Sequence, residues 1–190
     1  MNKSLIFNGK EVNMEKKVLV IISSPRKNGN SEMLSSQFAD GARKAGHHVE
    51  EIFLRELNIS PCIACEACLK NGGICVQKDD MKELLDKIIN ADVIALSTPV
   101  YYYSISAQLK IMIDRTLAGG GKMNNKEFYL ITTAADGKHA METTMEDMQR
   151  FVKCLPGSEV KGKIYGSAFH IGDIKGNPAL DIAYKYGENC

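Results

Sequence analysis

The chain has no excess of charge of either sign. Its 24 lysines and arginines almost balance its 23 aspartates and glutamates, so the formal net charge is +1. A nearly neutral surface has no strong field to attract the phosphate backbone of nucleic acid or an anionic membrane. We therefore expect neither nucleic acid nor membrane among its partners.

Long apolar runs are also missing. No stretch approaches the roughly 20 apolar residues that a membrane-spanning helix needs. The N-terminal segment offers only Leu5-Ile6-Phe7 before polar residues follow, which is too short for the apolar region of a secretory signal. The expectation is a cytoplasmic protein, and in that compartment cysteines stay reduced or bind metal rather than pair.

Several catalytic signatures are absent as well. The sequence contains neither GxxxxGK[ST] nor GxGxxG, which argues against the common nucleotide-binding loops. No Ser/His/Asp or Cys/His pairing and no carboxylate pair points to hydrolysis. With 190 residues, the chain is expected to form one domain that buries about 70% of its unfolded surface and needs no disulfides.

What the sequence does contain is a regular alternation of apolar runs and helix-period segments. Residues 17–22 form a continuous apolar run, as expected for a central parallel strand that is covered on both faces. Further strands are predicted at 48–54, 91–97, 127–133 and 163–169, and helices at 31–45, 80–90, 105–117, 141–155 and 178–186. This order predicts an α/β protein, a three-layer α/β/α sandwich with a five-stranded parallel sheet.

Some local predictions can be tested separately. Asn8-Gly9 is a strong two-residue turn signal and predicts a small hairpin in the first sixteen residues. Asp80 and Glu83 fit a capping box at the start of a helix. Of the two isolated cysteines, Cys154 is predicted to be a buried core thiol and Cys190 a tail residue.

A polar loop, SSPRKNGNS, connects the first strand to the first helix at residues 23–31. Small hydroxyl and amide residues, one glycine and Arg26 at a helix N-terminus are typical of a phosphate-binding loop. The alternative is an ordinary polar loop with Ser31 as the helix N-cap. In parallel sheets ligands lie at the carboxyl ends of the strands, which here are the loops that start at Ser23, Thr98, Thr133 and His170.

A second loop, TPVYYYS at residues 98–104, follows a buried strand. Its proline and successive tyrosines can offer backbone and aromatic contacts to a flat ring. The alternative is that the tyrosines form an interface or surface cluster.

Four cysteines lie close together at Cys62, Cys65, Cys68 and Cys75. The first three form CxxCxxC, and this crowding of soft ligands suits a [4Fe–4S] cluster. Zinc fits less well because it usually draws two separated cysteine pairs. A reduced cysteine loop without metal is the remaining alternative.

Together, SSPRKNGNSEML and TPVYYYSISAQLKIMIDR resemble the NAD(P)H-dependent FMN reductase group of flavodoxin-like proteins. The CxxCxxC…C…DDM element between them resembles the iron–sulfur flavoprotein branch of that group. The similarity covers nearly the whole chain from about Lys17 onward. It implies a flavodoxin-like sheet of order 2-1-3-4-5, an N-terminal arm at 1–16, and an FMN-binding domain at 17–190 with a cysteine-rich insert at about 60–78.

The resemblance also implies roles for particular residues. The FMN phosphate would be held by Ser24, Arg26, Asn28, Asn30 and Ser31. The isoalloxazine ring and ribityl chain would be bordered by Pro99, Val100, Tyr101, Tyr102 and Ser104, with Thr133 and Ala134 on the other side. The four cysteines would hold the cluster, and their segment is expected near the strand ends where FMN lies.

The function that follows is an FMN-dependent oxidoreductase. It would take electrons from NAD(P)H or a ferredoxin-type protein and pass them to a small-molecule acceptor, with no catalytic side chain because the flavin carries the chemistry. A homodimer or homotetramer is expected from the resemblance. Two other functions stay open: a non-catalytic electron carrier, which the near-neutral charge disfavours, and a zinc-stabilised binding module.

Overall fold

The computed structural model describes residues 5–7, 10–12 and 14–190. A five-stranded parallel sheet in the order β4-β3-β5-β6-β7 forms its centre. Counted along the chain from residue 17, this is the predicted order 2-1-3-4-5. The strands are β3 (Lys17–Ile22), β4 (His48–Phe53), β5 (Val93–Pro99), β6 (Glu127–Ala134) and β7 (Glu159–Ser167).

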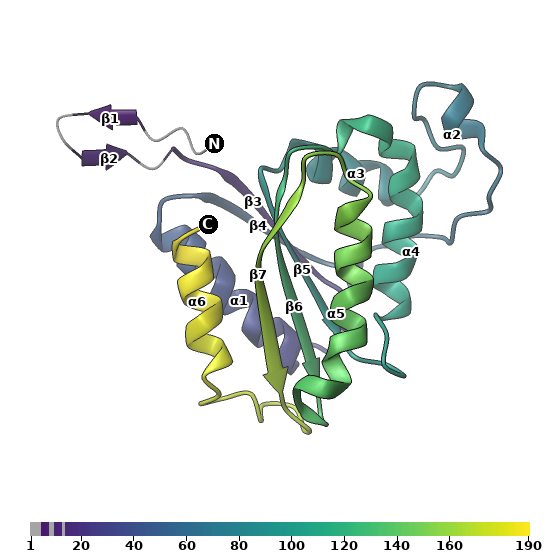
Figure 1. Ribbon diagram of the computed structural model, residues 1–190. Helices are drawn as coiled ribbons and strands as arrows, with labels where there is room; N and C mark the ends of the chain where they lie inside the picture. Colours follow the sequence, from purple (N-terminus) through teal and green to yellow (C-terminus); the bar gives the residue numbers. More distant parts are fainter. Residues whose placement is uncertain (1–4, 8–9, 13) are drawn as a thin grey trace.

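Helices cover both faces of this sheet, which confirms the three-layer sandwich (Figure 1). One face carries α1 (Asn30–Lys44) and α6 (Ala179–Glu188). The other carries α3 (Met81–Asn90), α4 (Ala107–Arg115) and α5 (Gly137–Lys153). Shorter elements are η1 (Leu54–Glu56), α2 (Ala67–Lys70) and η2 (Thr116–Lys122).

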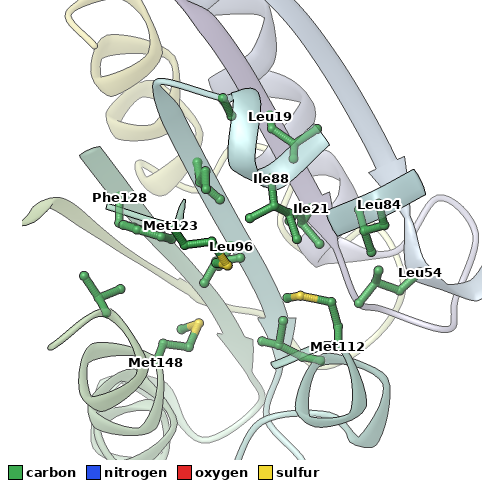
Figure 2. Packing of buried hydrophobic residues seen from close by; sticks show 14 of the residues in the cluster. Leu19, Ile21, Leu54, Leu84, Ile88, Leu96, Met112, Met123, Phe128 and Met148 are labelled. Carbon is green, nitrogen blue, oxygen red and sulfur yellow. The ribbon is translucent and has the colours of Figure 1, made fainter. Parts of the chain in front are cut away.

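The sheet divides the apolar core into two layers because side chains alternate along each strand. Leu19 and Ile21 of β3 point toward α3 and α4 and pack with Leu96 and Met112, as Figure 2 shows. The intervening Val18, Val20 and Ile22 pack toward α1 and α6. Each fully buried side chain of this size contributes about 1.5–3 kcal/mol, so the central strands are held firmly from both sides.

The N-terminal arm forms a separate two-stranded antiparallel sheet of β1 (Leu5–Phe7) and β2 (Lys10–Val12). The pairing agrees with the predicted hairpin, whereas the Asn8-Gly9 turn itself lies outside the described residues. In the part of the chain that the structure describes, no helix combines the length and apolar character required to span a bilayer.

The predicted capping box does not form, although its helix begins at Met81 as expected. The Asp80 carboxylate accepts a hydrogen bond from the backbone N–H of Asn58 at 2.7 Å instead. Its neighbour Asp79 accepts from the N–H of Met81 at 3.2 Å. The hydrogen bond from Asn58, in the loop that precedes the helix, thus replaces the predicted bond pair between Asp80 and Glu83.

The prediction for the two isolated cysteines is also wrong. Cys154 is exposed at the end of α5, whereas Cys190 is only 4% exposed and packs with the core under α1 and α6. Burial raises the pKa of the Cys190 thiol to about 11. Asn189 stays exposed, whereas the carbonyl oxygen of Cys190 lies 3.1 Å from the ring nitrogen Nε2 of the buried His47.

Glycine permits this close packing of α1 and α6. A Cβ atom on Gly187 would collide with the backbone carbonyl of Phe38, and one on Gly41 with the carbonyl of Tyr184. Backbone atoms cannot move aside as the end of a flexible side chain can. The two helices therefore approach to a distance that only glycine at these positions allows.

Gly187→Ala should therefore destabilise the fold by about 1–3 kcal/mol, because overpacking a close contact forces the two helices apart. Chemical denaturation followed by circular dichroism measures this change. The matched control is Gly121→Ala, since a Cβ there meets nothing within 4 Å. Equal stability of the two variants would contradict the close-packing argument.

Candidate functional site

The carboxyl ends of the strands enclose a hollow of about 170 Å³. Loops after β3, β5, β6 and β7 all reach it, as the topology of a parallel sheet requires. We call it the carboxyl-edge hollow. It is lined by Ser24, Arg26, Gly29, Asn30, Ser31, Pro99, Val100, Tyr101, Thr133, Ala134, Ala135, Ala168, Phe169 and Ile171.

Most of the site residues predicted from the sequence meet in this hollow. The structure brings together those from the three loops after β3, β5 and β6, although they are up to 110 positions apart in the sequence (Ser24 to Ala134). Asn28, Tyr102 and Ser104 do not line it. Asn28 faces a neighbouring groove with Glu32, and the Ser104 hydroxyl donates to Asp147 at 2.8 Å.

The floor of the hollow is the first turn of α1. Its N-cap, Gly29, makes no side-chain hydrogen bond, so backbone N–H groups of the first turn are available to an anion and the helix dipole favours negative charge there. Ser31 lies inside the helix and is not its N-cap. The guanidinium of Arg26 is exposed beside this turn, and no ion pair of it occurs within residues 14–190.

A carboxylate stiffens the loop before α1. Glu32 accepts a hydrogen bond from the N–H of Asn28 at 3.0 Å and forms an ion pair with Arg55 at 2.9 Å. The Arg55 and Glu32 side chains are 11% and 16% exposed, so the pair is largely shielded from water. Arg55 therefore offsets the negative charge that Glu32 would otherwise present close to an anion site.

Behind the hollow, buried hydroxyl groups fasten the loops to one another. The Ser106 hydroxyl donates to the Ser23 hydroxyl at 2.8 Å, and Ser23 donates to the carbonyl of Ser97 at 2.8 Å. The hydroxyls of Ser31 and Thr133 lie 2.6 Å apart, with either as the donor. The hydrogen bond between Ser31 and Thr133 uses the proton of one hydroxyl group. The proton of the other hydroxyl group can be donated to a ligand. Sequence reasoning named Ser23 only as the start of a loop and did not single out Ser97 or Ser106, because isolated serines carry no spacing signal.

Asn30 ties the fourth loop to α1. Its amide nitrogen donates to the carbonyl of His170 at 2.8 Å, and its amide oxygen accepts from the N–H of Gly172 at 2.9 Å. That loop adds Phe169 and Ile171 to the hollow, with exposed fractions of 69% and 58%. The sequence pointed to His170 as the start of a ligand loop but not to these two apolar residues.

The three tyrosines form the tip of a tight turn. The N–H and carbonyl groups of Tyr101 and Ser104 bond reciprocally at 3.0 Å. Tyr102 and Tyr103, between them, have φ values of 50° and 60°, a conformation that costs a non-glycine residue about 1–2 kcal/mol. Tyr102 is fully exposed. Such strain is characteristic of functional sites, where it positions a side chain for a partner.

The cysteine segment lies elsewhere. Cys62 and Cys65 are exposed, Cys68 and Cys75 are half-buried, and all four are free thiols. The Cys75 sulfur lies 3.6 Å from Arg115 at the end of α4, and α2 packs against η2. Figure 1 shows α2 at the end of the molecule opposite to the arrowheads of β6 and β7.

The expectation that this segment lies near the strand ends is therefore wrong. α4 begins beside the hollow at Ser106, which bonds to Ser23, and runs back along the sheet to Arg115. The cysteine segment is held at that far end through Arg115 and Asp79. A charge pair distant in sequence decides the direction of the segment.

The donor set suits an iron–sulfur cluster, because four unpaired thiols occupy one short loop. Among residues 14–190, no three His, Cys, Asp or Glu side chains converge in a metal-binding arrangement. To hold a cluster, the part of the loop that carries the exposed Cys62 and Cys65 has to close toward Cys68 and Cys75.

The fold and the hollow define a flavodoxin-like α/β protein with a polar loop and a helix N-terminus at the carboxyl edge of its sheet. Comparison with known proteins narrows this class. The family described as NADPH-dependent FMN reductase matches residues 16–169, and the chain belongs to that family. It is thus an FMN-dependent oxidoreductase by family.

Individual relatives agree with this assignment. An iron–sulfur flavoprotein of Methanocaldococcus jannaschii is 36% identical over 71% of this chain and 70% of its own length. One of Archaeoglobus fulgidus is 32% identical over 85% of this chain and 82% of its own. The fold resembles that of an azoreductase from Bacillus anthracis, with a TM-score of 0.71 and 17% identity over 92% of this chain and all of that one.

Asn30→Ala should loosen the loop at residues 168–177, because two hydrogen bonds worth about 0.5–1.5 kcal/mol each are lost. Hydrogen exchange measured by mass spectrometry should show faster exchange of this loop and little change in α1. Lys27→Ala is the control, since this exposed residue of the same loop before α1 has no left-handed backbone conformation and lies outside the hollow. Unchanged exchange in Asn30→Ala would mean that the loop is held by other contacts.

Proposed function

We propose that this oxidoreductase binds FMN in the carboxyl-edge hollow and uses it to pass electrons from NAD(P)H or a ferredoxin-type donor to a small-molecule acceptor. The observation that supports this most directly is the convergence of Ser24, Arg26 and the first turn of α1 on one hollow. FMN accepts and releases one or two electrons. The role of the protein is to hold it, orient it and control access to it.

The phosphate end of FMN is the part that the hollow suits. Arg26 supplies a cationic fork, Ser24 a hydroxyl and α1 its free N–H groups, which together make a strong site for a phosphate. Ser24 is 3% exposed and its oxygen accepts from the N–H of Arg26 at 3.3 Å. The loop is therefore shaped before a ligand arrives.

The flavin ring requires more room than the hollow offers. Its volume of about 170 Å³ is below the roughly 300–1,000 Å³ typical of pockets that enclose a small ligand. We infer that the ring lies toward the rim, where Pro99, Val100 and Tyr101 meet Phe169 and Ile171. Tyr102 and Tyr103 stand outside this rim, 102% and 57% exposed.

This exposed apolar rim suggests a second copy of the chain as its cover. Large apolar groups that gather on a surface commonly mark an interaction site. Here the exposed Phe169 and Ile171 line the hollow, and Tyr102 and Tyr103 are exposed beyond its rim. We therefore propose a homodimer or homotetramer in which a neighbouring copy shields the open side of the flavin.

We further propose that Cys62, Cys65, Cys68 and Cys75 hold a [4Fe–4S] cluster. Four free thiols on one loop provide the ligands, and two relatives with at least 30% identity are iron–sulfur flavoproteins by name. A cluster there would supply single-electron transfer from a protein donor. The cysteines do not line the hollow, and α2 lies at the end of the molecule opposite to the arrowheads of β6 and β7 (Figure 1), so the two groups would serve separate partners.

Arg26→Ala should weaken FMN binding about tenfold or more, because a charge-assisted hydrogen bond is worth about 1.5–3 kcal/mol. Titration of the apoprotein with FMN, followed by quenching of flavin fluorescence, measures the affinity. Riboflavin lacks the phosphate and should bind both proteins equally. Lys27→Ala is the control, since this exposed neighbour does not line the hollow.

A loss of riboflavin affinity in Arg26→Ala would contradict the phosphate role. An absence of FMN binding by the unaltered protein would contradict the proposed site altogether. Steady oxidation of NAD(P)H with a quinone acceptor distinguishes an enzyme from a pure electron carrier.

Protein purified without oxygen should contain about four iron and four sulfide per chain, as a [4Fe–4S] cluster requires. Metal analysis and the visible spectrum provide the measurement. Replacement of Cys75 by serine should lower the iron content strongly, whereas Cys154→Ser, at an exposed cysteine outside the loop, should leave it unchanged. One zinc per chain in place of iron would instead support a structural zinc site.

A further inference from the structure

Arg115, the last residue of α4, makes a buried ion pair with Asp79. Its two terminal nitrogens lie 2.7 Å and 2.9 Å from the two oxygens of the Asp79 carboxylate. The two side chains are 2% and 5% exposed. Hydrogen bonding to Arg115 lowers the pKa of Asp79, and the same bond raises that of Arg115. This bidentate geometry is specific to arginine and could not be reproduced by lysine.

The same guanidinium reaches both ends of the cysteine segment. It donates to the carbonyl of Ser60 at 2.6 Å and to the sulfur of Cys75 at 3.6 Å. Ser60 precedes the first cysteine of the loop, and Cys75 is the last. One buried cation therefore joins the start of the segment, its end and the helix beneath it.

Two further hydrogen bonds close the base of the loop. The N–H of Ser60 donates to Asp79 at 3.0 Å, and the Gln77 amide donates to the carbonyl of Pro61 at 3.0 Å. Between these points, residues 62–66 are exposed. The loop is thus fixed at its base, directly before Cys62, and the stretch that carries Cys62 and Cys65 is exposed to solvent.

We propose that Arg115 is a positioning residue for the cysteine loop: it closes the base of the loop and holds the Cys75 sulfur through an N–H donor on a buried cation. The closure of the loop stands on the geometry alone. The effect on a bound cluster rests on the proposed [4Fe–4S] site. Neither role is a direct part of the reaction at the flavin.

Closure of the loop has an entropic consequence. Without Arg115 the base of the segment would lose its link to α4 and would keep the Ser60–Asp79 and Gln77–Pro61 hydrogen bonds. The four thiols would then sample a larger volume before ligands could meet. The structure holds the Cys75 sulfur beside Arg115, whereas Cys62 and Cys65 are exposed to solvent. Removing the base contact should make the whole loop mobile.

The buried cation has an electrostatic consequence for a cluster. One-electron reduction by an external reductant adds one negative charge and neither forms nor breaks a bond to the protein. A nearby positive charge and an N–H donor to a ligand sulfur stabilise the reduced form, because reduction potentials depend on local charge and hydrogen bonds to sulfur. Arg115 should therefore raise the potential of a cluster ligated by Cys75.

The experiment compares the unaltered chain with Arg115→Met, Arg115→Lys and the double variant Arg115→Met/Asp79→Leu. The single Arg115→Met change leaves the Asp79 carboxylate buried without a partner and can prevent folding. The double variant removes both charges, and such apolar replacement of a buried pair usually preserves the fold. Arg150→Met is the control, because Arg150 forms only exposed pairs on α5.

Two readouts are taken on full-length, FMN-loaded protein. Hydrogen exchange of residues 61–74 reports closure of the loop, and a potentiometric titration after anaerobic reconstitution with iron and sulfide reports the cluster. We expect at least tenfold faster exchange in the double variant, with FMN affinity unchanged. At a fixed potential the ratio of reduced to oxidised cluster should fall about tenfold, which corresponds to 59 mV for one electron.

The proposal would be overturned if the double variant had the same hydrogen-exchange rate and the same cluster potential as the unaltered chain. A purely structural ion pair predicts that result. If the double variant does not fold, Arg115→Lys decides the closure of the loop, since it keeps the charge but loses the fork: exchange of residues 61–74 equal to that of the unaltered chain would overturn the proposal. If the unaltered chain takes up no iron, the cluster proposal fails, and the exchange of residues 61–74 still decides whether Arg115 closes the loop.

Discussion

Burial of the central strands β3 and β5 between two helical layers positions the functional loops of this protein. Leu19 and Ile21 face one layer, while Val18, Val20 and Ile22 face the other, so the strands cannot slide or rotate without exposing apolar surface. Their carboxyl ends are therefore fixed at one edge. The loops that begin at Ser23 and Val100 therefore start at that edge. The hydrogen bond between the buried hydroxyls of Ser106 and Ser23 joins the two loops.

The rim of the hollow differs from its floor in physical character. The floor is polar, whereas the rim carries the exposed Phe169 and Ile171, with Tyr102 and Tyr103 in solvent beyond it. Tyr102 and Tyr103 adopt left-handed backbone conformations, which lower the stability of the fold. A polar floor beside an exposed aromatic rim agrees with the proposed function. The floor would bind the phosphate end of a flat cofactor, and the other end would be left for a partner.

The chain separates its two chemical regions by the length of α4. Ser106 at its first end belongs to the hydroxyl network behind the hollow, and Arg115 at its last residue holds the cysteine loop. A single helix packed against the sheet through Leu109 and Met112 thus connects the two regions mechanically. Any transfer of electrons between them would have to cross the molecule or pass to another copy, which gives the proposed oligomer a functional meaning.

Local sequence determined the strands, the helices and most of the hollow, because apolar periodicity and the loops at strand ends are short-range signals. Residues 17–22 were recognisable as a central strand, and Ser24, Arg26 and Pro99 as loop residues beside it, without any knowledge of distant contacts. Only the tertiary structure decided that Asp80 would bond to Asn58 rather than cap its helix, that Cys190 would be buried, and that Arg115 would draw the cysteine loop away from the hollow. Each of these depends on a contact between residues far apart in the chain, whose energy no local pattern encodes.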